Sequence, residues 1–345
     1  MSGRGTVAFD ETRPYFETAD GVGVTERFDL TLSENPYPPL PSVRRELERV
    51  MGRANRYPEF LPQRLPRVIA NHVGVHPDQV VVGSGATGVA MQLMHALLRP
   101  GESILFARPT FDGYPIMAKM LDVRAIAVDL DPEGRQDLWS MVRAIDSRTR
   151  VVVLCRPHNP TGTLVSANEV AAFLAAVPRR VTVVLDEAYV EFLAGADVLD
   201  TVGLVRRHAN LLVLRTFSKA YGLAGLRIGY AFAGFELANR VRRWQVPFGM
   251  GAVAVAAVSA SYAAESEVRD RVARITAERE RLRAALLRAG VHVPRSHANF
   301  LYLDGPDIAS RLRVAGISVK AYPDGSARIA VGDSEASAAV LKALS

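Results

Sequence analysis

Cysteine and lysine are the scarce residues of this 345-residue chain. Cys155 is the only cysteine, which excludes an intramolecular disulfide and a metal site built on clustered cysteines. We therefore expect no metal site. Arginine supplies 38 of the 42 basic residues, because there are only four lysines, at Lys119, Lys219, Lys320 and Lys342. Lys219 lies in a turn rich in glycine and hydroxyl groups, so it is a candidate for chemistry rather than for surface charge.

Long apolar runs and blocks of like charge are also absent. No apolar run approaches the roughly 20 residues that span a bilayer. The start of the chain, MSGRGTVAFDETRPYF, lacks the charged-then-apolar pattern of a secretory signal. The net charge of +6 comes from arginines scattered among acids, without a basic block that would indicate nucleic-acid binding. We therefore expect a cytoplasmic protein that binds neither nucleic acid nor membrane.

Short apolar runs rich in β-branched residues alternate with helix-length segments over the first two thirds of the chain. Near-continuous apolar strands in such an alternation predict an α/β fold, with a mostly parallel sheet flanked by helices on both faces. The six runs lie at 79–83, 103–107, 124–130, 150–155, 181–186 and 211–217.

The pattern changes near residue 240. A charged helical stretch at 265–290 is followed by short strands around 299–303 and 327–332. This predicts a smaller α+β domain, with a boundary inside a long helix that begins near Phe235. The expected parts are an N-terminal arm that contributes to the small domain (1–40), a large ligand-binding domain (41–240) and a small C-terminal domain (241–345).

Glycines and polar residues follow four of the apolar runs. SGATG (84–88) opens a helix, where free amides and the helix dipole suit an anion. Asn159 stands in the proline turn RPHNPTG, Asp186 begins DEAYVEF, and Lys219 ends TFSK. Ligands of an open parallel sheet bind at the carboxyl ends of its strands, so we expect these groups to meet at one edge.

Each feature also has an ordinary structural explanation. Glycine-rich turns are common, Asn before Pro forms turns, and an acid at a strand end often caps a helix. Thr216 and Ser218 can satisfy backbone groups, and Arg227 can be a surface charge. Taken together, however, a phosphate cradle, an amide, a carboxylate and a lysine describe one ligand, pyridoxal phosphate.

The chain resembles the fold-type I aminotransferases, most closely the histidinol-phosphate aminotransferases. The resemblance covers essentially the whole sequence. It implies a pyridoxal-phosphate-dependent enzyme with a large domain and a smaller α+β C-terminal domain. By a ping-pong route, this enzyme would move an amino group from a small-molecule amino donor to a 2-oxo acid acceptor. The motifs are LSENPY, NRYPE, RPTF, HNPTG, DEAYVEF, RTFSKAYGLAGLRIGY, ANFLYL and ARIAVG.

The resemblance implies a role for each residue of the cofactor site. Lys219 would form an imine with the cofactor aldehyde and, once released, would move the substrate α-proton as a general base. Asp186 would pair with the pyridine nitrogen, Asn159 and Tyr189 would hydrogen-bond the phenolic oxygen, and Phe111 would stack on the ring. The cofactor phosphate would be held by Gly85, Ala86, Thr87, Thr216, Ser218 and Arg227.

Five further assignments come from the same resemblance. Arg328 would grip the terminal group of the substrate through its planar fork. Tyr57 would reach the cofactor phosphate across a subunit interface, which implies a homodimer. Tyr15 and Asn35 belong to an N-terminal segment that would cover the substrate, although Tyr15 can equally serve to anchor that arm. Lys320, in GISVKAYP, would assist a substrate phosphate or carboxylate.

Two departures from the family pattern leave the substrate open. Thr87 and Gly88 stand where the family usually carries an acidic pair, and Lys320 stands where arginine is common. Lysine keeps the charge but loses bidentate geometry. We expect histidinol phosphate and 2-oxoglutarate as the substrate pair, with aromatic amino acids as the next alternative. A decarboxylase of the threonine-phosphate type shares these motifs, whereas a non-catalytic regulator is disfavoured because no DNA-binding domain precedes them.

Overall fold

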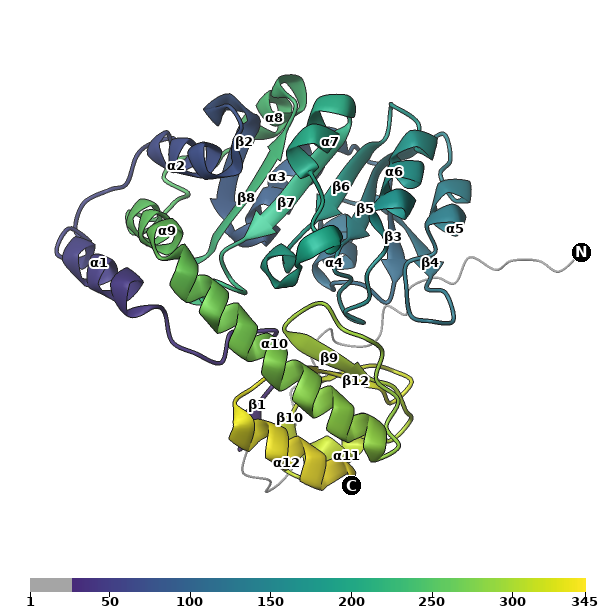
Figure 1. Ribbon diagram of the computed structural model, residues 1–345. Coiled ribbons are helices and arrows are strands. Elements are labelled where there is room, and N and C mark those ends of the chain that lie inside the picture. Colours follow the sequence, from purple (N-terminus) through teal and green to yellow (C-terminus); the bar gives the residue numbers. More distant parts are fainter. Residues whose placement is uncertain (1–26) are drawn as a thin grey trace, which may run out of the picture.

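The computed structural model describes residues 27–345, arranged as a large lobe around one sheet and a smaller lobe (Figure 1). The long helix α10 (Glu265–Arg288) runs from one lobe to the other. Tyr15 lies outside the described residues, so its predicted role stays a prediction. Within residues 27–345, no helix is both long and apolar enough to cross a membrane. The same residues contain no cluster of three or more histidine, cysteine or acidic side chains that could hold a metal.

The large lobe is built on a seven-stranded sheet. All six predicted strands are present, and β8 is a seventh that the sequence analysis did not predict. Only β8 runs antiparallel to its neighbours, so the prediction of a mostly parallel sheet is confirmed. In spatial order the strands are β2 (Val80–Ser84), β8 (Ile228–Ala233), β7 (Leu211–Thr216), β6 (Thr182–Asp186), β5 (Thr149–Cys155), β3 (Ser103–Arg108) and β4 (Arg124–Asp129).

Helices cover both faces of this sheet. Successive strand residues point to opposite faces, and Val80 and Val82 accordingly lie in one buried apolar cluster while Val81 lies in another. Both clusters are closed to solvent, which explains the near-continuous apolar runs. The helices are α1 (Pro41–Met51), α2 (Arg64–Val73), α3 (Gly85–Leu97), α4 (Gly113–Met120), α5 (Leu138–Arg143), α6 (Ala167–Ala176), α7 (Thr201–Arg207), α8 (Phe235–Arg242) and α9 (Ala254–Ala263), with 3-10 turns at Pro77–Gln79, Val190–Phe192, Gly195–Asp197 and Ala224–Leu226.

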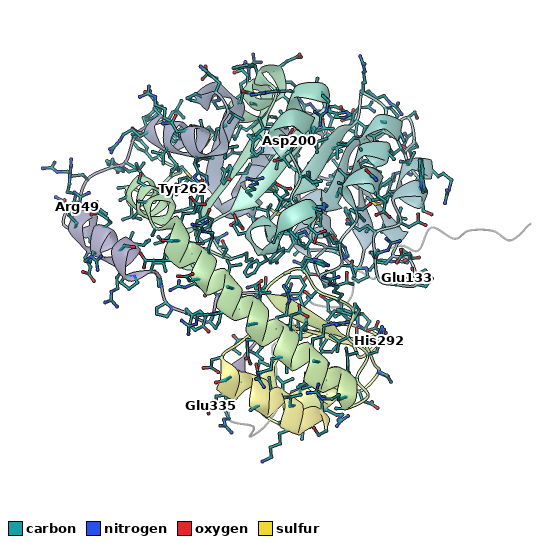
Figure 2. All side chains as sticks on the ribbon, viewed as in Figure 1. Arg49, Glu133, Asp200, Tyr262, His292 and Glu335 are labelled. Carbon is teal, nitrogen blue, oxygen red and sulfur yellow. The ribbon has the colours of Figure 1, made fainter. Side chains whose placement is uncertain are left out.

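The small lobe combines a three-stranded antiparallel sheet with two helices and α10. Its strands run in the order β11 (Lys320–Ala321), β12 (Ala327–Ala330) and β9 (Phe300–Leu303), and its helices are α11 (Ile308–Val314) and α12 (Ser334–Leu344). The N-terminal segment joins this lobe, because β1 (Phe28–Asp29) pairs in parallel with β10 (Ile317–Ser318). An ion pair of 2.7 Å also joins Arg27 to Glu335, which Figure 2 labels on the small lobe.

The prediction of one long helix from Phe235 is wrong. The helix that begins there, α8, ends at Arg242, and the following loop contains Pro247, Gly249 and Gly251, which disfavour continuous helix. The apolar contacts show where the lobes divide: α9 packs into the core of the large lobe, whereas the last turns of α10 belong to the core of the small lobe. The division at residue 240 stays a prediction.

Candidate active site

The candidate site lies where the carboxyl ends of three neighbouring strands meet the small lobe. Asn159 follows β5, Asp186 ends β6, and Lys219 follows β7. Arg328 reaches them from β12 of the small lobe, donating from Nη1 to Asn159 Oδ1 over 2.7 Å. The structure therefore brings together four residues that are separated by as much as 169 positions in sequence.

The amine of Lys219 is held by a short hydrogen-bond chain. Nζ donates to Ser33 Oγ over 2.8 Å, and Ser33 Oγ lies 2.8 Å from the hydroxyl of Tyr189. Burial, and after it the positive charge of Arg328, lowers the pKa of Lys219 from 10.5 to about 7. An amine with this pKa is largely neutral just above neutral pH, where it can accept a proton or act as a nucleophile.

Ser33 is a site residue that the sequence analysis missed. Its segment is tied to the lysine turn, because Asn35 Nδ2 donates to the carbonyls of Lys219 and Ala220, both over 3.0 Å. Asn299 Nδ2 donates in turn to the carbonyl of Ser33 over 3.2 Å. Asn35 therefore fixes the backbone beside the lysine.

Asp186 contacts Tyr114, a residue that the sequence analysis did not predict as part of the site. The hydroxyl of Tyr114, on α4, donates to Asp186 Oδ2 over 2.5 Å, and the amide of Ala188 donates to Oδ1 over 3.1 Å. Burial raises the pKa of Asp186, whereas the hydrogen bond from Tyr114 acts in the opposite direction. Phe111 packs edge-on against Tyr114, with ring centroids 5.6 Å apart.

Arg328 is a buried cation with unused hydrogen-bonding capacity. It is 7% exposed. Its Nη2 donates to the carbonyl of Thr31 over 2.8 Å, but its Nε has no partner. Both partners, Thr31 and Asn159, are neutral, and among residues 27–345 no carboxylate forms an ion pair with Arg328. A buried guanidinium in this state is suited to a carboxylate ligand.

A cradle for an anion lies at the start of α3. A Cβ on Gly85 would come within 2.2 Å of Arg227 Nη2, so the guanidinium lies directly over this glycine. A Cβ on Gly229 would likewise lie 2.2 Å from the amide nitrogen of Ala86. Thr216 pairs with Gly229 across the sheet and donates to Ser218 Oγ over 2.9 Å. Free amides, hydroxyls and a guanidinium therefore meet at one helix N-terminus.

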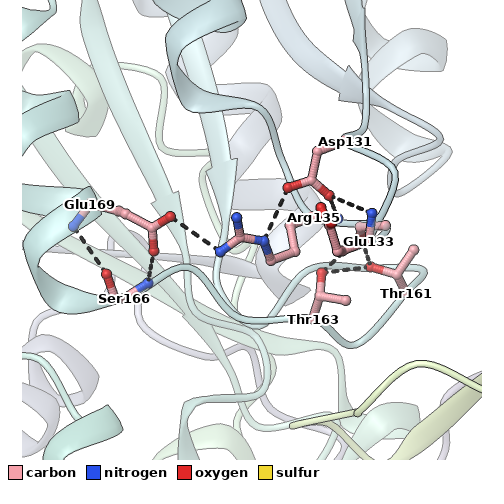
Figure 3. A network of polar contacts seen from close by, with 8 residues as sticks. Asp131, Glu133, Arg135, Thr161, Thr163, Ser166 and Glu169 are labelled. Atoms are coloured by element: carbon pink, nitrogen blue, oxygen red, sulfur yellow. Dashed lines mark hydrogen bonds and ion pairs between the residues drawn. The ribbon is translucent and has the colours of Figure 1, made fainter.

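The loop that carries Asn159 is fixed by the polar network in Figure 3. Thr161 and Thr163 both donate to the carbonyl of Gly134, over 2.8 and 2.9 Å. Arg135, next in the chain, forms an ion pair with Glu169 over 3.2 Å, at the start of α6. These contacts tie the loop after β5 to two neighbouring segments and so limit the movement of Asn159.

Tyr57 lies apart from this group, whereas Thr87 and Lys320 border it. Tyr57 is 85% exposed and packs against Phe248, with ring centroids 4.9 Å apart. It borders a cavity of about 680 Å³ between α1, α9 and the 56–65 segment, rather than the lysine site. Thr87 is exposed on the first turn of α3. Lys320 forms an ion pair of 2.5 Å with Asp112.

Comparison with known proteins identifies the family of this chain. The sequence model of the aminotransferases of class I and II matches residues 25–344. An aromatic amino acid aminotransferase from Cutibacterium acnes is 44% identical over 307 residues, which are 88% of this chain and 87% of that protein. The enzyme of the same name from Streptomyces coelicolor is 41% identical, covering 91% of this chain and 89% of the other.

The solved structures lead to the same class. The crystal structure of histidinol-phosphate aminotransferase from Sinorhizobium meliloti, in complex with pyridoxal-5'-phosphate, superposes with a TM-score of 0.85 at 25% identity. The match covers 99% of this chain and 98% of that one. The predicted resemblance is thus confirmed for the aminotransferase class and the fold. The chain belongs to the class I and II aminotransferases and is a pyridoxal-phosphate-dependent transaminase of fold type I, which uses an amino donor and a 2-oxo acid.

Proposed function

We propose that this transaminase acts on aromatic amino acids. Its relatives at 40–44% identity carry that name, whereas the structure named for histidinol phosphate is only 25% identical. The observation that carries the proposal is the state of Arg328, a buried cation with an unpartnered Nε. Such a group fits the α-carboxylate of an aromatic amino acid, and it can hold the carboxylate of the 2-oxo acid acceptor in the same way.

The donor set fits pyridoxal phosphate. The glycine cradle under Arg227 has no room for a Cβ at Gly85, and the hydroxyls of Thr216 and Ser218 hydrogen-bond each other beside it. An amine at Lys219 and a carboxylate at Asp186 complete the groups that this cofactor needs. We infer that Gly85, Ala86, Thr87, Thr216, Ser218 and Arg227 hold its phosphate, and that Phe111 packs on its ring.

The bound cofactor supplies an electron-withdrawing ring that stabilises negative charge at the substrate carbon. Asp186 keeps a proton on the ring nitrogen, and the hydroxyl of Tyr114 helps to keep Asp186 ionised. Asn159 and Tyr189, whose Nδ2 and hydroxyl lie 3.4 Å apart, orient the ring oxygen. Lys219 carries the proton from the substrate carbon, and Ser33 positions its amine for that transfer.

We also propose that the enzyme is a homodimer with shared active sites. Tyr57, Phe60 and Phe248 are at least 43% exposed, and the rings of Tyr57 and Phe60 both pack against Phe248 on the surface of the large lobe. Exposed aromatic clusters of this kind mark protein interfaces. A Tyr57 that lies away from the lysine of its own chain is available to the site of a partner.

Steady-state kinetics with a panel of donors tests the proposed substrate. With 2-oxoglutarate as acceptor, phenylalanine and tyrosine should give values of kcat/KM at least tenfold above that of histidinol phosphate. The difference should shrink in Arg328→Gln, which keeps a polar side chain but loses the charge that selects a carboxylate. A higher kcat/KM for histidinol phosphate would contradict the proposal. Release of carbon dioxide without formation of the 2-oxo acid would instead support the decarboxylase alternative.

A further inference from the structure

Lys320 and Asp112 form an ion pair between the two lobes. Lys320 Nζ lies 2.5 Å from Asp112 Oδ2. Lys320 begins β11 of the small lobe, whereas Asp112 directly follows Phe111 and precedes α4 of the large lobe. Asp112 stands at the helix N-terminus but makes no side-chain hydrogen bond to the helix. Its carboxylate is therefore engaged by Lys320 rather than by capping.

This pair lies beside the group that we assign to the substrate carboxylate. Lys320 and Arg328 are direct partners in the antiparallel pairing of β11 with β12. Directly opposed side chains share one face of a sheet, with Cβ atoms about 4.5–5.5 Å apart. Tyr302 is opposite Arg328 on the other side, and the ring of Tyr322 lies 6.0 Å from Lys320 Nζ. The face around Arg328 thus consists of two tyrosines and one lysine.

The two cations on this face are in different electrostatic states. Arg328 has only neutral partners, so its charge is available to a ligand. The charge of Lys320 is compensated by Asp112. A substrate that enters beside Arg328 therefore meets one uncompensated positive charge, and next to it a neutral ion pair and aromatic rings.

We propose that Asp112 is a specificity-determining residue that masks Lys320 and thereby disfavours phosphorylated amines relative to aromatic amino acids, whose side chains are uncharged. A phosphate monoester carries about two negative charges at neutral pH, and Arg328 can compensate only one of them. A phosphorylated amine would therefore have to separate the ion pair or leave its second charge unpaired next to a carboxylate. Both outcomes disfavour it relative to an aromatic amino acid. This inference rests on the proposed function, since it assumes that the substrate binds at Arg328.

Freeing Lys320 is the direct test. In Asp112→Asn, the lysine can donate to a phosphate, and a charged hydrogen bond of this kind corresponds to about tenfold in affinity at a partly exposed site. We expect kcat/KM for histidinol phosphate to rise about tenfold, and kcat/KM for phenylalanine to fall. Binding is measured independently by calorimetry on the holoenzyme with phenyl phosphate, which has a ring and a phosphate but no amine to react. Its dissociation constant should fall about tenfold.

The double variant Lys320→Met, Asp112→Asn provides the matched control. It removes both charges, so the face beside Arg328 has no net charge from these two positions, as in the wild type. The preference for phenylalanine over histidinol phosphate and the dissociation constant of phenyl phosphate should both return to within about threefold of wild type. A tenfold weaker binding of phenyl phosphate by this double variant would mean that Lys320 already serves a phosphate in the wild type, which overturns the proposal.

Failure of this inference is distinguishable from failure of the proposed function. If wild-type enzyme does not transaminate phenylalanine, the substrate assignment itself is wrong. If it does, and Asp112→Asn retains full cofactor content with an unchanged preference between the two substrates, only the masking role of Asp112 is refuted. Asp112→Ala, which frees Lys320 in the same way, answers the same question where Asp112→Asn fails to fold.

Discussion

The buried lysine should destabilise the cofactor-free protein. Lys219 has its pKa lowered from 10.5 to about 7, mainly by burial. The change Lys219→Met keeps the length of the side chain but removes the charge. One pKa unit corresponds to about 1.4 kcal/mol, so the full shift corresponds to about 5 kcal/mol. The side chain keeps some contact with solvent, and we therefore expect Lys219→Met to raise the free energy of unfolding by about 2–4 kcal/mol at pH 7.

The pH dependence of this difference gives the sharper test. Below pH 7 the lysine is protonated in both the folded and the unfolded chain, so the cost of burying its charge is fully present. Between pH 7 and 10.5 the unfolded chain holds the proton and the folded chain does not, so wild-type stability rises with pH. The advantage of Lys219→Met should therefore be largest at pH 6–7 and shrink progressively towards pH 10.

The assay is urea unfolding of the cofactor-free protein, followed by circular dichroism at pH 6, 7, 8 and 9. The cofactor must be removed because binding to the folded state adds its own stabilisation. Lys342→Met, at an exposed lysine of α12, is the matched control and should leave stability within about 0.5 kcal/mol of wild type. A difference between Lys219→Met and wild type that does not change with pH would refute the reasoning.

Three further predictions concern activity. Arg328→Ala should lower kcat/KM for phenylalanine about a hundredfold or more, since charged hydrogen bonds contribute roughly 1.5–3 kcal/mol each. Arg328→Lys should recover only part of the lost kcat/KM. An unchanged kcat/KM in Arg328→Ala would remove Arg328 from the substrate site. Activity should fall below pH 7 as Lys219 is protonated. Ser33→Ala should lower kcat about tenfold and move the acidic limb of the pH–activity profile to lower pH, because the hydroxyl oxygen of Ser33 favours the charged amine. An unmoved pH profile would leave Ser33 with no role in positioning. Mixing a Tyr57→Phe variant with a Lys219→Ala variant should restore activity in mixed dimers, and a fully active monomer would contradict the shared site.

Much of the fold followed from the sequence because the sheet is buried on both faces. Strands of this kind are short, apolar runs, and all six that the sequence predicts are present. The missed strand, β8, begins inside the motif of Lys219 and Arg227, where the glycines Gly222, Gly225 and Gly229 interrupt the apolar pattern. A helix does begin at Phe235, but its predicted length was wrong because the loop after α8 breaks a segment that otherwise has helical composition.

The site was predictable where its residues follow strands and unpredictable where they come from elsewhere. Asn159, Asp186 and Lys219 each stand at a strand end, so the topology of a parallel sheet predicts that they meet. Tyr114 lies on an apolar helix and has the pattern of a core residue. Ser33 contacts Lys219 over 186 positions in sequence, and only the packing of the two lobes brings these residues together.

The charge state of the face around Arg328 was also not predictable from the sequence. Lys320 was expected to face a phosphate or carboxylate of the substrate, which its charge alone permits. The ion pair with Asp112 joins residues of different lobes and has no sequence signal. Whether a lysine is free or compensated depends on such tertiary contacts, so composition and motifs do not determine it.

The attachment point of the cofactor tests the central assignment most directly. The chain has only four lysines, so borohydride reduction of the holoenzyme, proteolysis and peptide mass mapping give an unambiguous answer. We predict that the reduced cofactor is found, at close to one per chain, on the peptide that contains Lys219. Labelling of Lys119, Lys320 or Lys342 in its place, or an unlabelled Lys219 peptide in active enzyme, would contradict the account of this site.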